Sequence, residues 1–221
     1  KPDSFAKWAG EARDAFVFAI KGPQLVTHIK RLKNCEQELA NFLASGPLAL
    51  GTKLGPFIWQ LPPNLGYDRD VLAGFLALLP QTTADYVALA SKADERLKSP
   101  PYLDAKHVGP IRHAIEMRHA SFDLREVNQL LAEHNVARVI ADTAENPSRE
   151  LTADFAYCRL QGPIGGNGYQ AADIADWAAT VKAWAETGRD VFAYFVHEDK
   201  LHAPANAIAL RQAAGISLPD D

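Results

Sequence analysis

The chain has 221 residues, of which 48% are hydrophobic, and this is enough for the core of one large α/β domain. Its 23 Lys and Arg residues are outnumbered by 27 Asp and Glu residues, and the formal net charge of -4 excludes a global basic field that would hold polyanions non-specifically. No apolar run approaches the roughly 20 residues that a bilayer span needs, and the opening segment has no signal-peptide core. We therefore expect a cytoplasmic protein that does not associate with a membrane.

Short apolar runs rich in β-forming residues alternate with longer segments of helical period along the chain. Six runs predict strands, and they begin at Ala15, Pro56, His113, Ala137, Phe155 and Asp190. Five segments predict helices, at about residues 35–44, 70–79, 124–134, 173–187 and 203–214, with Asp123 and Asp173 expected as N-caps of the third and fourth. This alternation is typical of repeated βα units, so the sequence predicts a single α/β domain with a parallel sheet over residues 1–221.

One segment does not suit an ordinary connection between a helix and a strand. Residues 82–109 hold a helical stretch and then the Pro-rich run SPPYLDAKHVGP. A connection of this length is uncommon inside a compact domain. We therefore expect a peripheral insertion at about residues 82–109.

The sequence indicates neither a cofactor nor a metal. The Gly-rich run GPIGGNGY from Gly162 follows a late strand and lacks the G-x-G-x-x-G spacing of a dinucleotide site, and no P-loop is present. Cys35 and Cys158 lie far apart without metal-ligand neighbours, so both are expected to be free thiols. His197 is followed directly by two acidic residues, but adjacent residues of a strand point to opposite sides and cannot all bind one ion.

Periodicity alone leaves an open doubly wound sheet and a barrel as alternatives, and five segments together favour the barrel. They are FAIKGPQLVTH, LGPFIWQLPPNL, AIEMRHASF, TADFAYCRLQG and DVFAYFVHED. In this order they resemble the YecE-like family, domain-of-unknown-function family seventy-two. The resemblance implies a (β/α)8 barrel of the TIM type that is incomplete here, because the family's first two βα units precede the point where this chain starts.

The chain departs from the family pattern at the ends of two expected strands. Gln161 stands where family members usually have a His, and Val196 and His197 stand where they have a pair of Asn residues. Barrel enzymes keep their working groups at such strand ends. These departures put any family activity in doubt for this chain, and the family itself carries no established reaction.

Polar residues inside otherwise apolar strands are the strongest signal of a site. Residues two apart share a face of a strand, so Glu116 and Arg118 are expected to point together into the barrel, with Ile115 and Met117 packed against helices. The same alternation gives Arg159 and Tyr194 as inward-facing residues of later strands. Lys21 and Gln60 lie in the first two strands, the latter held by the two prolines that follow it, and Asp142 closes the fourth.

Two interpretations of this polar set remain open. It is either a structural ion network that plugs the mouth of the barrel, or a site for a polar ligand at the usual working end of the fold. His28 and His119 follow strands and are either ligand-binding groups or loop residues. In the ligand interpretation Glu116 and Asp142 are the acid or base candidates.

The function that we expect is binding of an anionic or phosphate-bearing small molecule in a cation-rich pocket at the C-terminal mouth. The candidate binding residues are Lys21, His28, Gln60, Arg118, His119, Arg159 and Tyr194. A hydrolase or lyase reaction is compatible with this set, so the sequence leaves open whether the protein is an enzyme. The alternatives are a non-catalytic module that binds nucleic acid or a phospho-ligand, which the net charge does not support, and a degenerate scaffold that binds nothing.

Overall fold

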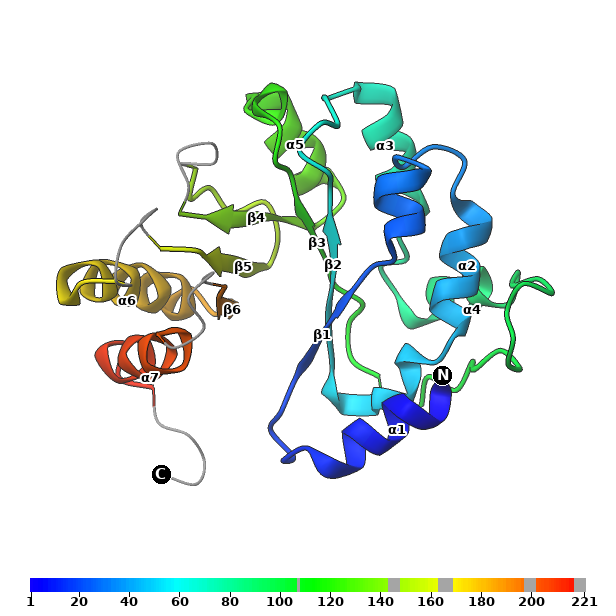
Figure 1. Cartoon of the computed structure of the whole chain (residues 1–221), viewed down its shortest axis with the longest axis horizontal. Coiled ribbons are helices and arrows are strands. Elements are labelled where there is room, and N and C mark those ends of the chain that lie inside the picture. Colours follow the sequence, from blue (N-terminus) through cyan, green and yellow to red (C-terminus); the bar gives the residue numbers. More distant parts are fainter. Residues whose placement is uncertain (107, 143–147, 163–168, 197–201, 217–221) are drawn as a thin grey trace. The chain divides into compact units, whose positions relative to one another are not determined.

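The chain folds as two units, Lys1–Phe122 and Asp123–Asp221, each built on parallel strands. In the computed structural model, residues 1–106, 108–142, 148–162, 169–196 and 202–216 are described (Figure 1). The α/β class and the six predicted strands are confirmed. A closed barrel would have to be formed by both units together. The eight-stranded barrel therefore stays a prediction.

The N-terminal unit carries three strands whose order in the sheet follows their order in the chain. Its elements are α1 Pro2–Glu11, β1 Phe18–Lys21, η1 Leu25–Ile29, α2 Glu36–Ala44, η2 Pro47–Lys53, β2 Leu54–Gln60, α3 Arg69–Leu78, α4 Thr83–Ala90, β3 His113–Glu116 and η3 Ala120–Phe122. β1 pairs with β2 and β2 with β3, both in parallel. Helices α2, α3 and α4 lie to one side of β1 and β2 in Figure 1.

Large aromatic side chains of β2 fill the space between this sheet and its helices. Phe57 and Trp59 are fully buried, and the ring of Trp59 makes edge contacts with Phe42 of α2 at 5.9 Å and with Phe75 of α3 at 5.4 Å. Aromatic rings bury large apolar areas and favour such edge-to-face pairs. The same ring explains Gly22, because a Cβ there would lie 2.3 Å from a Trp59 ring carbon.

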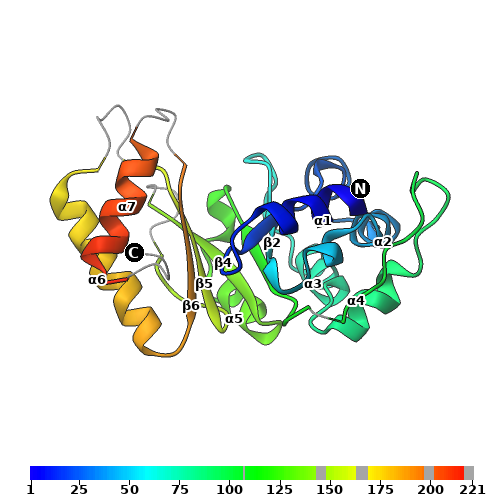
Figure 2. The same cartoon turned by 90° about the horizontal axis from the view of Figure 1, so that it is seen from below.

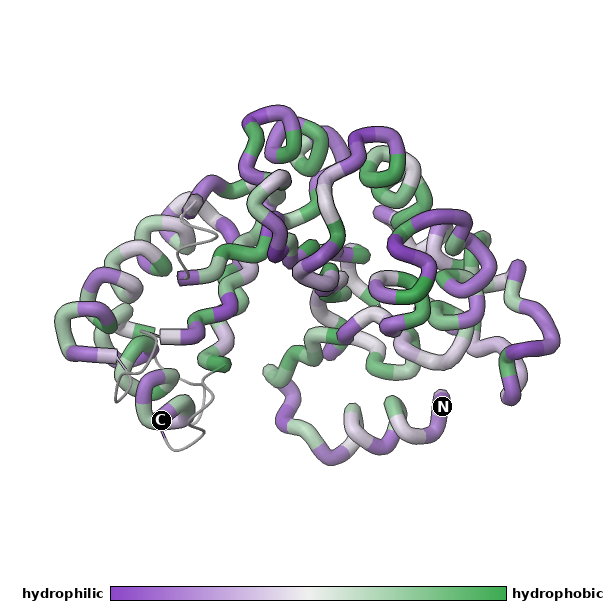
Figure 3. The backbone as a smooth tube through the Cα atoms, turned by 45° about the horizontal axis from the view of Figure 1, so that its top comes forward, coloured by the Kyte–Doolittle hydropathy of each residue, from purple (hydrophilic) through white to green (hydrophobic). Residues whose placement is uncertain are grey.

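Helix α1 was not among the predicted helices. It begins with a proline in its first turn, and its Phe5 and Trp8 rings meet edge to face at 5.3 Å. Hydrophobic and hydrophilic residues alternate along it (Figure 3). Lys53, from η2, donates from Nζ to the carbonyl oxygens of Ala9 and Ala12 at 2.7 and 2.8 Å. A cation at the carbonyl end of a helix satisfies groups that the helix itself leaves open.

The segment at 82–109 has two parts that behave differently. Its helix, α4, packs on α2: Tyr86 is fully buried and donates from its hydroxyl to the carbonyl of Leu43 at 2.8 Å. The rest of the segment contains no helix or strand among its described residues, and it is largely hydrophilic (Figure 3). The expectation of a peripheral segment therefore applies to residues 91–109, whereas α4 is part of the packed unit.

The C-terminal unit also has three strands with parallel pairing from β4 to β5 and from β5 to β6. Its elements are α5 Arg125–Glu133, β4 Val136–Ala141, β5 Phe155–Leu160, α6 Ala171–Glu186, β6 Asp190–Phe195 and α7 Ala203–Ala213. Figure 2 shows α6 and α7 side by side next to the strands. A buried cluster that includes Ile140, Cys158, Trp177 and Leu210 joins these helices to β4 and β5.

Both predicted N-caps in this unit are wrong. Helix α5 has Leu124 at its N-cap, and no side chain caps it. The N-cap of helix α6 is Gln170, three residues before Asp173; Asp173 accepts from the backbone N–H of Gln170 at 2.9 Å and completes a capping box. An acidic residue can bond to free backbone N–H groups either from the N-cap or from the third position of the helix. Residue type alone therefore does not tell which residue is the N-cap.

Within the described residues, no single helix is long and apolar enough to cross a membrane. Helices α3 and α4 reach that length and composition only as a pair, across a bend of 99°. The cytoplasmic location stays a prediction.

Candidate functional site

A chain of polar side chains runs across the ends of the three strands of the N-terminal unit. Lys21, at the end of β1, donates from Nζ to Oε1 of Gln60 at 2.8 Å. Gln60 donates from Nε2 to Oε2 of Glu116 at 2.8 Å, and Arg118 donates from Nε to Oε1 of Glu116 at 2.9 Å. Four residues that the sequence marks as site candidates are thus brought together, and we call them the strand-end chain.

Strand alternation explains why these four side chains meet. Trp59 and Ile115 are partners in the pairing of β2 and β3, and Trp59 points to the helices. One residue further, Gln60 and Glu116 are again partners and must point to the opposite side. Glu116 therefore points to the side of the sheet away from the helices, as predicted, and that this side is the interior of a barrel stays a prediction.

The two ends of the strand-end chain are accessible, whereas its centre is not. The side chain of Glu116 is 3% exposed and both of its carboxylate oxygens accept hydrogen bonds. Arg118 is 40% exposed, and within the described residues its two terminal nitrogens, Nη1 and Nη2, make no hydrogen bond. Lys21 is also exposed. A buried carboxylate therefore holds a guanidinium whose outer edge still offers donors to solvent.

The two candidate histidines are bonded to residues one or two positions away in the chain. His28, in η1, has its Nδ1 2.8 Å from the hydroxyl of Thr27. His119 accepts at Nδ1 from the backbone N–H of Ser121 at 3.2 Å, and the Ser121 hydroxyl lies 2.8 Å from the same nitrogen. That hydroxyl oxygen accepts from the N–H of Tyr67 at 2.7 Å. Such local bonds order a turn, and neither histidine takes part in the strand-end chain through a described contact.

The candidates of the C-terminal unit form a different arrangement. Asp142 accepts from the backbone N–H groups of Gln161 and Gly162 at 2.7 and 3.1 Å and from the hydroxyl of Tyr169. Burial and the hydrogen bond to Asp142 hold the pKa of Tyr169 above its usual value, so this hydroxyl stays protonated. The carboxylate of Asp142 thus anchors the segment after β5, which argues against a role for it as a general base.

Arg159 and Tyr194 are partners in the pairing of β5 and β6. The Tyr194 ring stacks on that of Tyr157, with 5.3 Å between their centroids, and burial raises the pKa of Tyr194. Arg159 is half-buried. The expected convergence of Arg159 with the cations of the strand-end chain concerns both units and stays a prediction.

Several buried polar residues were not singled out from the sequence, among them His113 and Arg138. His113, in β3, is fully buried; it accepts at Nδ1 from the indole N–H of Trp59 at 3.2 Å, and its Nε2 lies 2.8 Å from the carbonyl oxygen of Pro80. Burial lowers its pKa to about 4. Arg138, in β4, is 4% exposed and donates to Asn128 of α5 at 2.8 Å. Each side chain packs against helices of its own unit, and His113 lies on the side of the sheet opposite to Gln60 and Glu116.

The described residues contain no group of three or more His, Cys, Asp or Glu side chains that could hold a metal ion. Cys35 and Cys158 are free and buried, as expected, and burial raises their pKa values to about 11 and about 12. Thiols of this kind are inert under ordinary conditions. His197, for which the sequence argues against a metal site, lies outside the described residues.

Comparison with known proteins gives a consistent relationship. Residues 1–220 match the family described as "Protein of unknown function DUF72". The UPF0759 protein YecE of Escherichia coli K12 is 26% identical over 175 residues, which are 74% of this chain and 53% of that protein. The YecE protein of E. coli O157:H7 is 24% identical over the same shares. The chain therefore spans about half the length of the curated relatives it matches.

Two solved structures share the fold. A DUF72 family protein from Enterococcus faecalis V583 matches with a TM-score of 0.70 and 18% identity, over 98% of this chain and 85% of that one. A DUF72 family protein from Thermotoga maritima MSB8 matches with a TM-score of 0.62 and 21% identity, over 95% and 78% of the two chains. At these identities the likeness concerns the fold alone.

Proposed function

The chain belongs to the DUF72 family of proteins of unknown function, and on that premise we propose that its strand-end chain binds a small anionic ligand, with phosphate-bearing molecules as the preferred class. The observation that carries this proposal is the donor geometry of Arg118. Its Nε is bonded to the buried Glu116, its side chain is 40% exposed, and within the described residues Nη1 and Nη2 make no hydrogen bond. A fixed guanidinium fork is suited to phosphate and carboxylate oxygens.

Lys21 supplies a second cation at the other end of the strand-end chain. Its ammonium group carries three protons, and its bond to Gln60 uses one of them. Gln60 and Glu116 lie between the two cations and connect them through hydrogen bonds. An anion that bridges Lys21 and Arg118 would thus meet donors whose positions are already set, which lowers the entropic cost of binding.

Binding is better supported than acid or base catalysis. A general base needs an accessible lone pair and a general acid an accessible proton, but both oxygens of Glu116 accept hydrogen bonds and its side chain is buried. Glu116 is therefore proposed as the residue that positions Arg118. A hydrolase or lyase reaction would need a different acid or base, so the enzyme hypothesis now ranks below binding.

A titration of inorganic phosphate into the protein by calorimetry, in a chloride background of constant ionic strength, tests this proposal. Arg118→Gln and Lys21→Gln should each weaken phosphate binding by at least tenfold, because each removes one cation. Lys7→Gln is the matched control, since Lys7 is 71% exposed and its ion pair with Glu11 lies within α1. Equal phosphate affinity in all four proteins, or no phosphate binding by the parent, would refute the proposal.

Glu116→Gln separates positioning from charge. It keeps Lys21 and Arg118 but removes the carboxylate that holds the guanidinium in place. If Glu116 positions Arg118, phosphate binding should weaken although the site has gained one net positive charge. Tighter phosphate binding by Glu116→Gln would show that simple charge, without positioning, governs the site.

A further inference from the structure

The N-terminal unit also contains a cavity. It has a volume of about 260 Å³ and is formed by the segment after η1, the loop between β2 and α3, the first turn of α3 and η3. Its lining residues are Lys30, Arg31, Leu32, Lys33, Leu65, Gly66, Asp68, Val71, Leu72 and Phe122. None of the four residues of the strand-end chain lines it, so it requires its own explanation.

One wall of this cavity is apolar and firmly held. Leu32, Leu65, Leu72 and Phe122 are each 9% exposed or less. Leu32 has a φ of 67°, and its N–H donates to the carbonyl of Val26 at 3.1 Å. A non-glycine residue in this left-handed region is held there by its surroundings at a cost of roughly 1–3 kcal/mol. The apolar surface is therefore formed in advance of any ligand.

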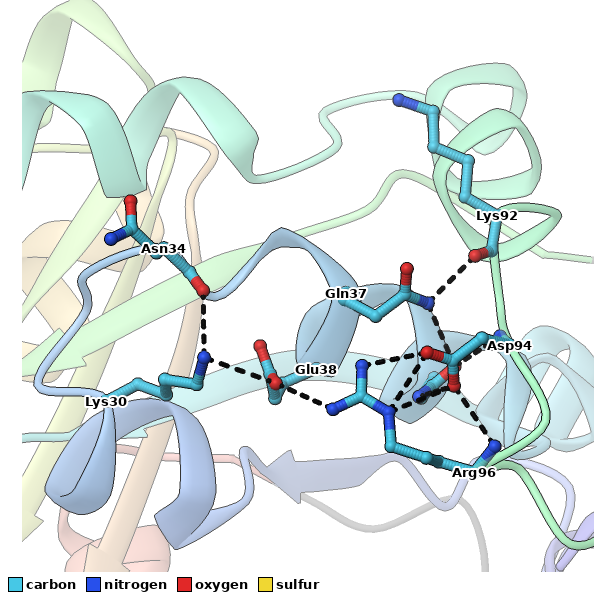
Figure 4. A network of polar contacts seen from close by, with 8 residues as sticks. Lys30, Asn34, Gln37, Glu38, Lys92, Asp94 and Arg96 are labelled. Carbon is cyan, nitrogen blue, oxygen red and sulfur yellow. Dashed lines mark hydrogen bonds and ion pairs between the residues drawn. The ribbon is translucent and has the colours of Figure 1, made fainter.

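The other side of the cavity is positively charged. Lys30, Arg31 and Lys33 lie around it against one acid, Asp68, whose carboxylate caps α3 by accepting from the N–H of Val71 at 3.2 Å. Both terminal nitrogens of Arg31 are bonded to Asn64, and Lys30 contacts Glu38 at 3.4 Å (Figure 4). Within the described residues the ammonium group of Lys33 makes no hydrogen bond or ion pair. The cavity therefore combines a buried apolar wall with a cation that has no protein partner there.

We propose that this cavity is a binding site for a small aromatic acid, a single ring that carries a carboxylate or a similar anionic group. A dry cavity of about 150 Å³ is large enough to take up benzene, so 260 Å³ accommodates one ring with an acidic substituent. The ring contacts Leu32, Leu72 and Phe122, and the acidic group meets Lys33. Neither an apolar ligand nor a small inorganic anion would satisfy both sides of this cavity.

Gly66 makes the proposal testable without disturbing the core. Its φ lies outside the left-handed region, and a Cβ there would meet only the Ser121 hydroxyl at 3.7 Å and a His119 ring carbon at 4.0 Å, which are ordinary contacts. Gly66→Leu should therefore fold, and it adds a large side chain to the wall of the cavity. Gly109→Leu is the matched control, because nothing lies within 4 Å of a Cβ at that position and it does not line the cavity.

The experiment measures the binding of benzoate and of benzyl alcohol by ligand-observed NMR, with circular dichroism to confirm that each variant is folded. The parent and Gly109→Leu should bind benzoate equally, and Gly66→Leu should bind it at least tenfold more weakly. Lys33→Gln should weaken benzoate binding several-fold and leave the weaker binding of benzyl alcohol unchanged. Arg118→Gln should bind benzoate as the parent does, which separates this cavity from the strand-end chain.

Three results would overturn the inference. They are the absence of benzoate binding by the parent, equal binding by Gly66→Leu, and equal affinity of the parent for benzoate and benzyl alcohol. The first two would show that the cavity is not the site, and the third would show that Lys33 does not select an anion.

Discussion

Two buried glutamates in the N-terminal unit have cations beside them, yet they use these cations differently. Glu38 of α2 lies 3.1 Å from Nη1 of Arg96, and the other guanidinium donors of Arg96 bond to Asp94 (Figure 4). Arg118 bonds to Glu116 of β3 through Nε, and within the described residues its terminal nitrogens make no hydrogen bond. Where all donors of the guanidinium bond to the protein, the ion pair holds two segments together. Where it leaves a fixed edge open, the pair is suited to hold a ligand.

The network around Glu38 ties the segment after α4 to α2. Asn41 donates from its side-chain amide to Asp94 at 2.8 Å, and Gln37 donates to the carbonyl of Lys92 at 2.9 Å. Interaction with Arg96 and Asn41 holds the pKa of Asp94 at about 2. Burial opposes the ionisation of Glu38, but its backbone hydrogen bond and its two cationic partners outweigh this and lower its pKa.

The largest loss of stability is expected on substitution of His113, a buried polar residue with a purely structural role. His113→Phe keeps an aromatic ring but leaves the Trp59 N–H and the Pro80 carbonyl without their partner. Each unsatisfied buried group costs about 1–3 kcal/mol, so the free energy of unfolding should fall by about 3 kcal/mol. Urea denaturation at pH 7 measures this loss. A loss below about 1 kcal/mol would mean that neither bond matters to stability.

The same residue predicts how stability depends on pH. The pKa of His113 is about 4 in the folded chain and 6.5 as a free side chain, so the unfolded chain binds the proton first as the pH falls. Its contribution is complete above about pH 6.5 and is lost as the pH falls toward 4, by about 3 kcal/mol at most. Between pH 6.5 and 4 the free energy of unfolding should therefore fall less in His113→Phe than in the parent. The control His134→Gln should lose as much as the parent over the same range.

A smaller loss of stability is expected on substitution of Glu38. It tests whether the ion pair of Glu38 holds two segments together. Glu38→Gln removes the charge that Lys30 and Arg96 contact, and the free energy of unfolding should fall by about 1–2 kcal/mol. Glu36→Gln is the control, because its pair with Lys92 is exposed at both ends and should contribute less than about 0.5 kcal/mol. Since the pKa of Glu38 is lowered, the difference between the two variants should shrink as the pH falls below 4.5. Equal losses in both variants at pH 7 would contradict a fastening role.

The smallest effect concerns the outer part of the segment after α4. Lys98 and Lys106 are exposed and lie beyond the residues that the Glu38 network holds. Brief trypsin treatment should therefore cleave first after these lysines and leave the remainder folded. Mass spectrometry identifies the cut sites. First cleavage after Arg96 or within a strand would show that the network does not hold this segment as described.

The strand-end chain was largely predictable because strand alternation is a local rule. The alternation of Ile115 and Glu116 is visible in the sequence, and the paired prolines after Gln60 mark the end of β2. The order in which the four residues bond was not predictable, since the pairing of Gln60 with Glu116 depends on the register between β2 and β3. Register is set by the packing of Trp59 and its neighbours, and a sequence window contains no information on contacts across 56 residues.

Three features could not be predicted from the sequence because each depends on contacts with residues far away in the chain. Helix α1 receives its C-terminal bonds from Lys53, and His113 is buried by Trp59 and Pro80, so both depend on partners far away in the chain. Helix α4 seemed peripheral because a Pro-rich run follows it, but burial of Tyr86 against α2 includes it in the core. The convergence of Lys21 and Arg118 with Arg159 would join the two units, and it remains a prediction from the alternation of the strands.

The most direct test of the account compares the melting temperatures of the parent and Arg118→Gln in phosphate and in chloride at equal ionic strength. Phosphate at roughly a hundred times its dissociation constant should stabilise the parent by about 2.7 kcal/mol beyond chloride, which corresponds to a rise of several degrees. Arg118→Gln should itself lose about 1–3 kcal/mol in chloride, because the buried Glu116 loses a charged donor, and should show no difference between the two salts. Equal responses of the parent to phosphate and chloride would contradict the account and leave the strand-end chain as a structural ion network.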